Sequence, residues 1–260
     1  MLTFNLDKML ILGPSFFENY FYSTFMIMNH IFDDFKVSEG DIIVVKPYFE
    51  NIIQKYSKVD DLLKDHEEID TIVITGVGSS IFGTAALAKT VANVLMKPVA
   101  GIVSGYGSLD LIQEAVEGYY KIVQKTITST LFNKQEIYVK GVKDSEVLIE
   151  LLEKNSDRMK MLVGHSKGAL SIANALFGLE NKLIKIDRNI EIVTFSCPVH
   201  LPKSYKNIRQ YLGFFDWFLG PVNKTADNEE YKIVYIAGHT TNMMIPYHMP
   251  VEYLLTTHNL

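Results

Sequence analysis

The chain has 260 residues, of which 48% are hydrophobic and 21% are charged, a composition that suits one globular domain with a full core. Its net charge of −5 argues against a nucleic-acid-binding protein, because such proteins normally present a basic surface. No apolar run reaches the roughly 18 residues of a membrane span, and the first residues lack the basic segment and cleavage site of a signal peptide. We therefore expect a cytoplasmic protein, with non-standard secretion left open.

Five short apolar runs rich in β-branched residues predict buried strands, at 41–46, 71–75, 159–163, 190–195 and 231–237. The spacing of apolar residues predicts an amphipathic helix over 145–155, and no clear strand pattern lies between 196 and 230. Buried strands that alternate with helices indicate a mostly parallel sheet covered by helices on both faces. We therefore expect a single α/β domain over 1–260, in which the only cysteine, Cys197, is a small buried side chain.

The segment 81–133 differs from the rest of the chain because it is apolar and rich in glycine. We expect a helical insertion there that lines the substrate site or covers it as a lid. Ordinary helices packed on one face of the sheet are the alternative. The part at 81–107 also raises the hypothesis of peripheral contact with a membrane.

The most informative motif is G-H-S-K-G at 164–168, which has an apolar run before it and a helix-like segment, 169–176, after it. A G-x-S-x-G pentapeptide between strand and helix is typical of a nucleophile elbow, in which a tight turn holds the serine hydroxyl clear of the sheet. Glycines flank such a serine because larger side chains would collide with the neighbouring strand and helix. The motif predicts Ser166 as a nucleophile, and a structural turn with Ser166 as a helix N-cap is the alternative.

A serine nucleophile that attacks a carbonyl needs two preorganised N–H donors for the oxyanion. One is expected from Lys167, and the other from the glycine-containing loop at 76–80, where we choose Val77. This loop does not fit a dinucleotide-binding pattern, because Ile81 stands where that pattern needs glycine. We expect the Lys167 side chain to be solvated and His165 to pack beneath the elbow.

The base and the orienting acid should follow the serine, in the order acid and then histidine. His239 directly follows the last predicted strand and is the preferred base, with His248 as the alternative. Asp216 is the preferred acid, because a carboxylate in its apolar, aromatic stretch is costly without a partner such as an imidazolium. Asp227, in a polar turn, is the alternative acid.

The elbow sequence V-G-H-S-K-G-A, followed by A-N-A-L at 173–176, resembles that of class 3 (fungal-type) lipases and their bacterial relatives. The run T-F-S-C-P at 194–198 resembles the T-F-G-x-P strand end of the same family. The resemblance covers the chain from about residue 159 onward and departs from the family where Ala169 replaces a second glycine. It implies an α/β-hydrolase fold, with Ser166 as nucleophile, an acid within 210–230 and His239 as base.

Together these features predict a serine hydrolase, lipase-like or esterase-like, that cleaves a small-molecule or lipid ester through an acyl-enzyme. No metal or cofactor is expected, because the histidines show no H-x-x-x-H or similar ligand spacing. Lipases of this family are often secreted, so the lack of a signal peptide favours an intracellular esterase or acyl hydrolase. A thioesterase or polyester-type acyl hydrolase is one alternative, and a catalytically silent hydrolase fold used for binding is another. The oligomeric state stays open.

Overall fold

The computed structural model describes residues 15–34, 36–77, 79–104, 141–184, 186, 189–217 and 231–257. Within these residues a nine-stranded sheet has the strand order β1-β3-β2-β5-β4-β6-β7-β8-β9. The strands are β1 (Ile31–Phe32), β2 (Ile42–Val45), β3 (Ile52–Tyr56), β4 (Thr71–Ile74), β5 (Val99–Ile102), β6 (Met161–His165), β7 (Glu191–Phe195), β8 (Ile208–Gly213) and β9 (Lys232–Val234). The helices are α2 (Ser15–Phe21), the 3-10 helix η1 (Thr24–Ile27), α3 (Val59–Asp65), α4 (Ile81–Leu95), α6 (Lys143–Asn155), α7 (Lys167–Asn181) and α9 (Val251–Thr256).

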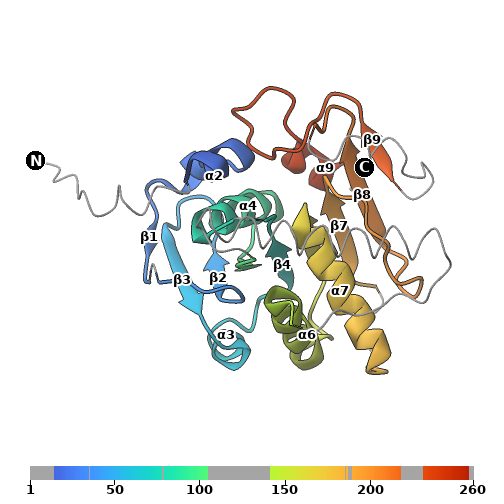
Figure 1. Ribbon diagram of the computed structural model, residues 1–260. Coiled ribbons are helices and arrows are strands. Elements are labelled where there is room, and N and C mark those ends of the chain that lie inside the picture. Colours follow the sequence, from blue (N-terminus) through green and yellow to red (C-terminus); the bar gives the residue numbers. More distant parts are fainter. Residues whose placement is uncertain are drawn as a thin grey trace, which may run out of the picture.

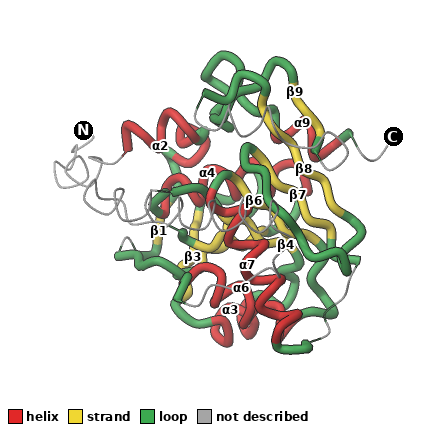
Figure 2. Tube along the Cα trace, turned by 45° about the vertical axis from the view of Figure 1, so that its right-hand side comes forward, coloured by secondary structure: helices red, strands yellow, loops and turns green. Residues whose placement is uncertain are grey.

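The sheet is mostly parallel and has helices on both faces (Figure 1). The strands from β5 to β9 in this order all run parallel, whereas β2 is antiparallel to both of its neighbours. Alternate strand residues enter two cores: Ile42 of β2 packs with α3, α6 and α7, and Ile43 packs with α4 and α9. Figure 2 shows the helices in red around the yellow strands. This arrangement confirms the expected mixed α/β architecture.

All five strands expected from apolar runs are present, as β2, β4, β6, β7 and β9, although β9 is not buried as expected, and the expected helix is α6. Cys197 is buried, as expected. The expectation of no clear strand between 196 and 230 is wrong, because β8 lies there. Its apolar pattern is broken by two buried polar side chains that have partners: Arg209 bonds the Leu254 carbonyl, and Gln210 accepts from Thr194.

The expectation of an insertion over 81–133 is wrong for its first part. Helix α4 packs against the sheet, with Leu87 and Val91 only 1% and 0% exposed, and β5 pairs with β2 and β4 inside the sheet. Gly101 allows this close packing, since a Cβ there would lie 2.7 Å from the Thr84 side chain. The side chains of Leu87 and Val91 are therefore part of the core, while peripheral membrane contact by other residues of 81–107 stays a hypothesis. Residues 105–133 of the expected lid lie outside the described residues.

The described helices include none that is both long and apolar enough to cross a membrane. The parallel strands β4, β6, β8 and β9 end at one common edge of the sheet. Ligands of open α/β sheets bind at this carboxyl edge. The segments that follow these four strands carry, in order, Val77, Ser166, Asp216 and His239. The fold therefore brings the loops of all four residues to the same edge.

Candidate active site

Ser166 forms the sharp turn between β6 and α7. Its backbone has φ 53° and ψ −122°, a left-handed conformation that is uncommon for a residue with a side chain. Strain of this kind costs of the order of 1–3 kcal/mol and clusters at functional sites. In this described stretch the Ser166 side chain makes no capping hydrogen bond to α7, contrary to the N-cap alternative. The turn has the geometry expected of a nucleophile elbow.

The two glycines of the motif, Gly164 and Gly168, are required because any side chain at these positions would clash with neighbouring backbone. A Cβ on Gly168 would lie 2.1 Å from the Ile74 carbonyl oxygen, and one on Gly164 would lie 2.8 Å from the Ala169 backbone. Either contact is far closer than atoms can approach, so α7 can lie against β4 and β6 only with glycine at both positions. The reason for the flanking glycines given from the sequence is therefore confirmed.

The loop after β4 approaches the Ser166 side chain closely. A Cβ on Gly76 would lie 3.0 Å from Ser166 Cβ and 3.4 Å from Ser166 Oγ. The Gly76 N–H donates to Tyr22 Oη at 2.7 Å, so it is already engaged. The next amide, that of Val77, is the one we predicted as an oxyanion donor. Gly78 lies outside the described residues.

Asp216 and His239 form a buried hydrogen-bonded pair. His239 Nδ1 lies 2.8 Å from Asp216 Oδ2, and the two residues are 3% and 1% exposed. An ionised carboxylate only accepts hydrogen bonds, so the proton lies on Nδ1, and Nε2 of the neutral ring is the basic nitrogen. The loops meet closely at Gly213, where a Cβ would lie 2.5 Å from the Gly238 carbonyl oxygen. The expected acid and base are thus brought together.

His165 connects the elbow to the His239 loop. Its Nε2 lies 2.8 Å from the His239 carbonyl oxygen, and its Nδ1 lies 2.9 Å from Tyr22 Oη. Since a carbonyl only accepts, Nε2 carries the proton and Nδ1 accepts from the tyrosine hydroxyl. Burial, with a smaller contribution from His239, lowers the pKa of His165 to about 3. His165 therefore stays neutral beneath the elbow, where we expected it to pack.

Ser166 and His239 lie on adjoining segments. The rings of His165 and His239 have centroids 5.1 Å apart, which places the base beside the residue that precedes the serine. Among the described residues, no hydrogen bond joins the Ser166 hydroxyl to the His239 ring. In hydrolases without substrate this contact is often long and shortens only in the complex. The roles of Ser166, Asp216 and His239 stay predictions.

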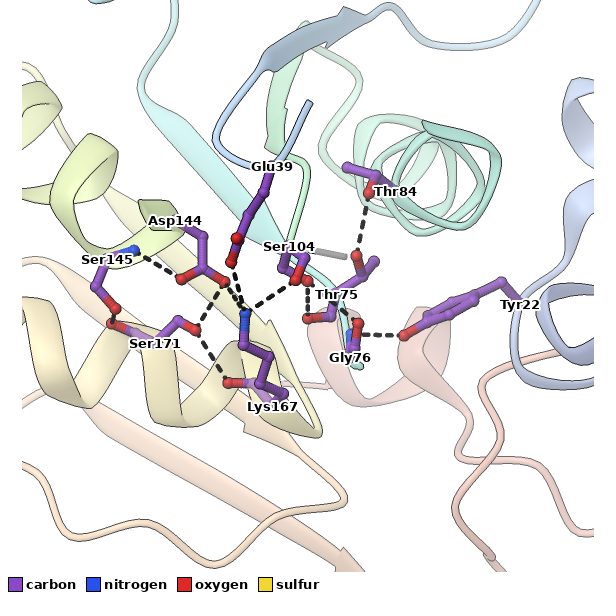
Figure 3. A network of polar contacts seen from close by, with 10 residues as sticks. All are labelled: Tyr22, Glu39, Thr75, Gly76, Thr84, Ser104, Asp144, Ser145, Lys167 and Ser171. Atoms are coloured by element: carbon purple, nitrogen blue, oxygen red, sulfur yellow. Dashed lines mark hydrogen bonds and ion pairs between the residues drawn. The ribbon is translucent and has the colours of Figure 1, made fainter. Parts of the chain in front are cut away.

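The Lys167 side chain is buried, contrary to the expectation that it is solvated (Figure 3). Its Nζ lies 2.8 Å from Asp144 Oδ2, 2.9 Å from the Ser104 carbonyl oxygen and 3.4 Å from Glu39 Oε1. Burial alone would lower the pKa of Lys167, but the carboxylates of Asp144 and Glu39 raise it above its ordinary value. The side-chain ammonium group of Lys167 is therefore part of the interior. The backbone N–H of the same residue lies in the first turn of α7.

The sequence contained a signal for this burial. Lys167 is the only Lys, Arg, Asp or Glu between positions 161 and 179, a stretch made mostly of apolar and small residues. A lone charge in such a stretch needs a buried partner. The sequence does not show that Asp144 is this partner or that the Ser104 carbonyl also binds Lys167, because both residues lie far from Lys167 along the chain. The contact between Tyr22 and His165 was unpredictable for the same reason.

The N-terminal helix lies beside the histidine loop. The Phe21 carbonyl oxygen accepts from the Thr241 N–H at 2.8 Å and from the Thr241 hydroxyl at 2.9 Å. The Ser23 hydroxyl accepts from the Met243 N–H at 3.1 Å. Since Tyr22 also bonds the loop after β4, this N-terminal segment contacts both loops that surround Ser166.

The alternative site residues are placed differently. His248 directs Nδ1 to the Ile245 carbonyl oxygen at 3.1 Å, and the structure pairs His239 rather than His248 with Asp216. Asp227 lies outside the described residues. In the described part of the chain, no three His, Cys, Asp or Glu side chains are grouped so that they could hold a metal ion.

Large apolar side chains are exposed next to the Asp216–His239 pair. We call this group the aromatic rim; its members are Phe214, Phe215, Trp217, Tyr235, Ile236, Met244 and Tyr247. Rings from the loop after β8 contact rings from the loop after β9, with centroids 5.9 Å apart for Phe214 and Tyr235 and 5.5 Å apart for Phe215 and Tyr247. Grouped exposed apolar side chains are more informative than single ones and often mark a binding surface.

No protein-family model matches this chain, and no curated protein matches it. The resemblance to class 3 lipases consequently depends on the motifs alone.

Proposed function

We propose that this protein is a serine hydrolase that cleaves carboxylic esters of apolar acyl groups. One observation carries the proposal: the buried Asp216–His239 pair lies against His165, the residue before a serine whose backbone is held at φ 53° between a strand and a helix. A carboxylate, an imidazole and a serine on a strained turn make up a nucleophile with its base and the group that orients the base.

In the proposed reaction, Ser166 Oγ attacks the ester carbonyl carbon while His239 Nε2 accepts the hydroxyl proton. Asp216 holds the ring in the required tautomer and stabilises the imidazolium. The N–H groups of Lys167 and Val77 bind the oxyanion of the tetrahedral intermediate. The imidazolium then protonates the leaving alcohol, and water, activated by the neutral ring, hydrolyses the acyl-enzyme and frees Ser166.

The aromatic rim supports an apolar substrate. Its side chains come from the loops that carry Asp216 and His239, so a bound ester would meet exposed rings next to the reacting groups. Aromatic rings contribute large apolar contact areas to binding surfaces. Esters with longer acyl chains should therefore react with lower KM than acetate esters.

The test is labelling of the purified protein with a fluorophosphonate probe, which reacts only with activated serines. We expect the wild type to label, Ser166→Ala to be unlabelled, and His239→Ala to label at least about a hundredfold more slowly, which is the lower end of the range for loss of a general base. His248→Ala is the matched control, since it removes a histidine close by in the chain and should label like the wild type.

Two results would redirect the proposal. A wild type that fails to label, with and without detergent, would favour a catalytically silent fold used for binding. Labelling together with preferential cleavage of acyl thioesters would favour the thioesterase alternative, because the same triad serves both substrates. A series of esters and thioesters with matched acyl chains makes this distinction.

A further inference from the structure

The carbonyl groups of Thr75 and Gly76, which follow β4, both face Ser104. The Ser104 hydroxyl lies 2.8 Å from the Thr75 carbonyl oxygen and 3.2 Å from the Gly76 carbonyl oxygen. Since both carbonyls only accept, the hydroxyl is the donor and shares its single proton, mainly with the nearer oxygen. On the other side, the Gly76 N–H donates to Tyr22 Oη at 2.7 Å.

These contacts define the direction of the Val77 N–H. A trans peptide is planar, so its N–H points away from its C=O, and the described backbone contains no cis bond. The Gly76 carbonyl faces Ser104, so the N–H of the same peptide, which belongs to Val77, faces the opposite side. Gly76, in the loop after β4, lies against the side chain of Ser166, which follows β6.

Ser104 is itself held by the buried charges (Figure 3). Its carbonyl oxygen accepts from Lys167 Nζ at 2.9 Å, and Lys167 is paired with Asp144, whose side chain is fully buried. Asp144 also accepts from the Ser171 hydroxyl at 2.9 Å and from the Ser145 N–H at 2.8 Å. The elbow helix α7 and the loop after β4 are thereby connected through one ammonium group and one serine.

We propose that Ser104 is a positioning residue for the oxyanion hole. Its hydroxyl, held in place by Lys167, orients the Gly76–Val77 peptide so that the Val77 N–H is available to the oxyanion formed at Ser166. Without that hydroxyl, the Thr75 carbonyl loses its Ser104 donor and the Gly76 carbonyl keeps only the longer contact from the Ser79 N–H at 3.4 Å, so the peptide is held less firmly and can rotate. A rotated peptide presents a carbonyl oxygen where the oxyanion needs a donor. This inference depends on the proposed serine-hydrolase function.

The test compares Ser104→Ala with Ser171→Ala, a matched control. Each change removes one hydroxyl from the same buried network, but only Ser104 reaches the loop after β4. With 4-nitrophenyl butyrate we expect kcat of Ser104→Ala to fall about tenfold or more at nearly constant KM, a smaller effect than the roughly hundredfold loss of a whole oxyanion donor. Ser171→Ala should keep kcat within about twofold of the wild type, because the Ser171 hydroxyl bonds Asp144 and the Lys167 carbonyl but neither of the proposed oxyanion N–H groups.

Thermal melting of both variants shows whether each is folded. Equal kcat for folded Ser104→Ala and Ser171→Ala would overturn the inference. If Ser104→Ala does not fold, Ser104→Cys keeps the volume but donates only weakly, and full kcat in that variant would also overturn it. A wild type that neither labels nor cleaves the ester contradicts the proposed function itself, and this result is recognised without any variant.

Discussion

Removal of the Tyr22 hydroxyl should destabilise the protein strongly. Tyr22 is 2% exposed, and its Oη accepts from the Gly76 N–H at 2.7 Å and donates to His165 Nδ1 at 2.9 Å. Burial raises the pKa of Tyr22 above its ordinary value, so the hydroxyl keeps its proton. Tyr22→Phe retains the ring and leaves both of these buried partners unpaired.

The expected loss follows from those two partners. Each buried donor or acceptor left unpaired costs about 1–3 kcal/mol, so Tyr22→Phe should lower the free energy of unfolding by about 2–6 kcal/mol. Urea unfolding followed by circular dichroism measures this quantity. The same variant should lower kcat, because the Gly76 loop and the His239 backbone lose their shared support.

Tyr56→Phe is the control for Tyr22→Phe. Tyr56 is 8% exposed, and its hydroxyl reaches Asp65 Oδ2 only at 3.5 Å. So long a contact is weak, and its loss should cost less than about 1 kcal/mol. If Tyr22→Phe proved as stable as Tyr56→Phe, the reasoning that the tyrosine hydroxyl satisfies two buried groups would be refuted.

Two further predictions concern buried charge and pH. Lys167→Met leaves the Asp144 carboxylate buried without its cation, so it should lower the free energy of unfolding by about 3–5 kcal/mol, whereas Lys167→Met with Asp144→Asn should lose less; equal urea midpoints for the two variants would contradict this. Burial lowers the pKa of His165 to about 3, while an unfolded histidine titrates near about 6.5. The unfolded state therefore binds more protons in this window, and the free energy of unfolding should fall as the pH drops from about 6.5 towards 3. His165→Asn, measured by urea unfolding at several pH values, should show a shallower dependence, and an unchanged slope would exclude His165 as its source.

Local apolar patterns predicted much of the sheet. β2, β4 and β7 are nearly continuous runs of β-branched residues, which become buried on both faces, and this is the composition that periodicity detects. β8 escaped detection because Arg209 and Gln210 interrupt its apolar run, and their partners come from other elements. The first part of the expected lid was wrong for a related reason: a helix and a strand that are both deeply buried resemble an apolar insertion when seen as sequence.

The parts of the site that depend on neighbouring residues in the sequence could be predicted. The elbow could be read from adjacent residues, and the pairing of Asp216 with His239 followed from chain order and the cost of an unpaired buried carboxylate. The supporting contacts were not predictable in this way, since Tyr22 and His165 are 143 positions apart. Nothing in a single sequence specifies such pairs before the fold has brought them together.

The contact between the N-terminal segment and the histidine loop joins residues about as distant as the chain allows, with Phe21 and Thr241 separated by 220 positions. Closing so long a loop costs conformational entropy, which the contacts of this segment must offset. The site therefore depends on hydrogen bonds between segments near the start and near the end of the described chain. The segment is firmly held, since Glu18 and Tyr22 are 3% and 2% exposed. Removal of the residues up to Tyr22 would therefore take away hydrogen bonds to the loop after β4 and to the histidine loop together, although every described strand lies outside the removed part.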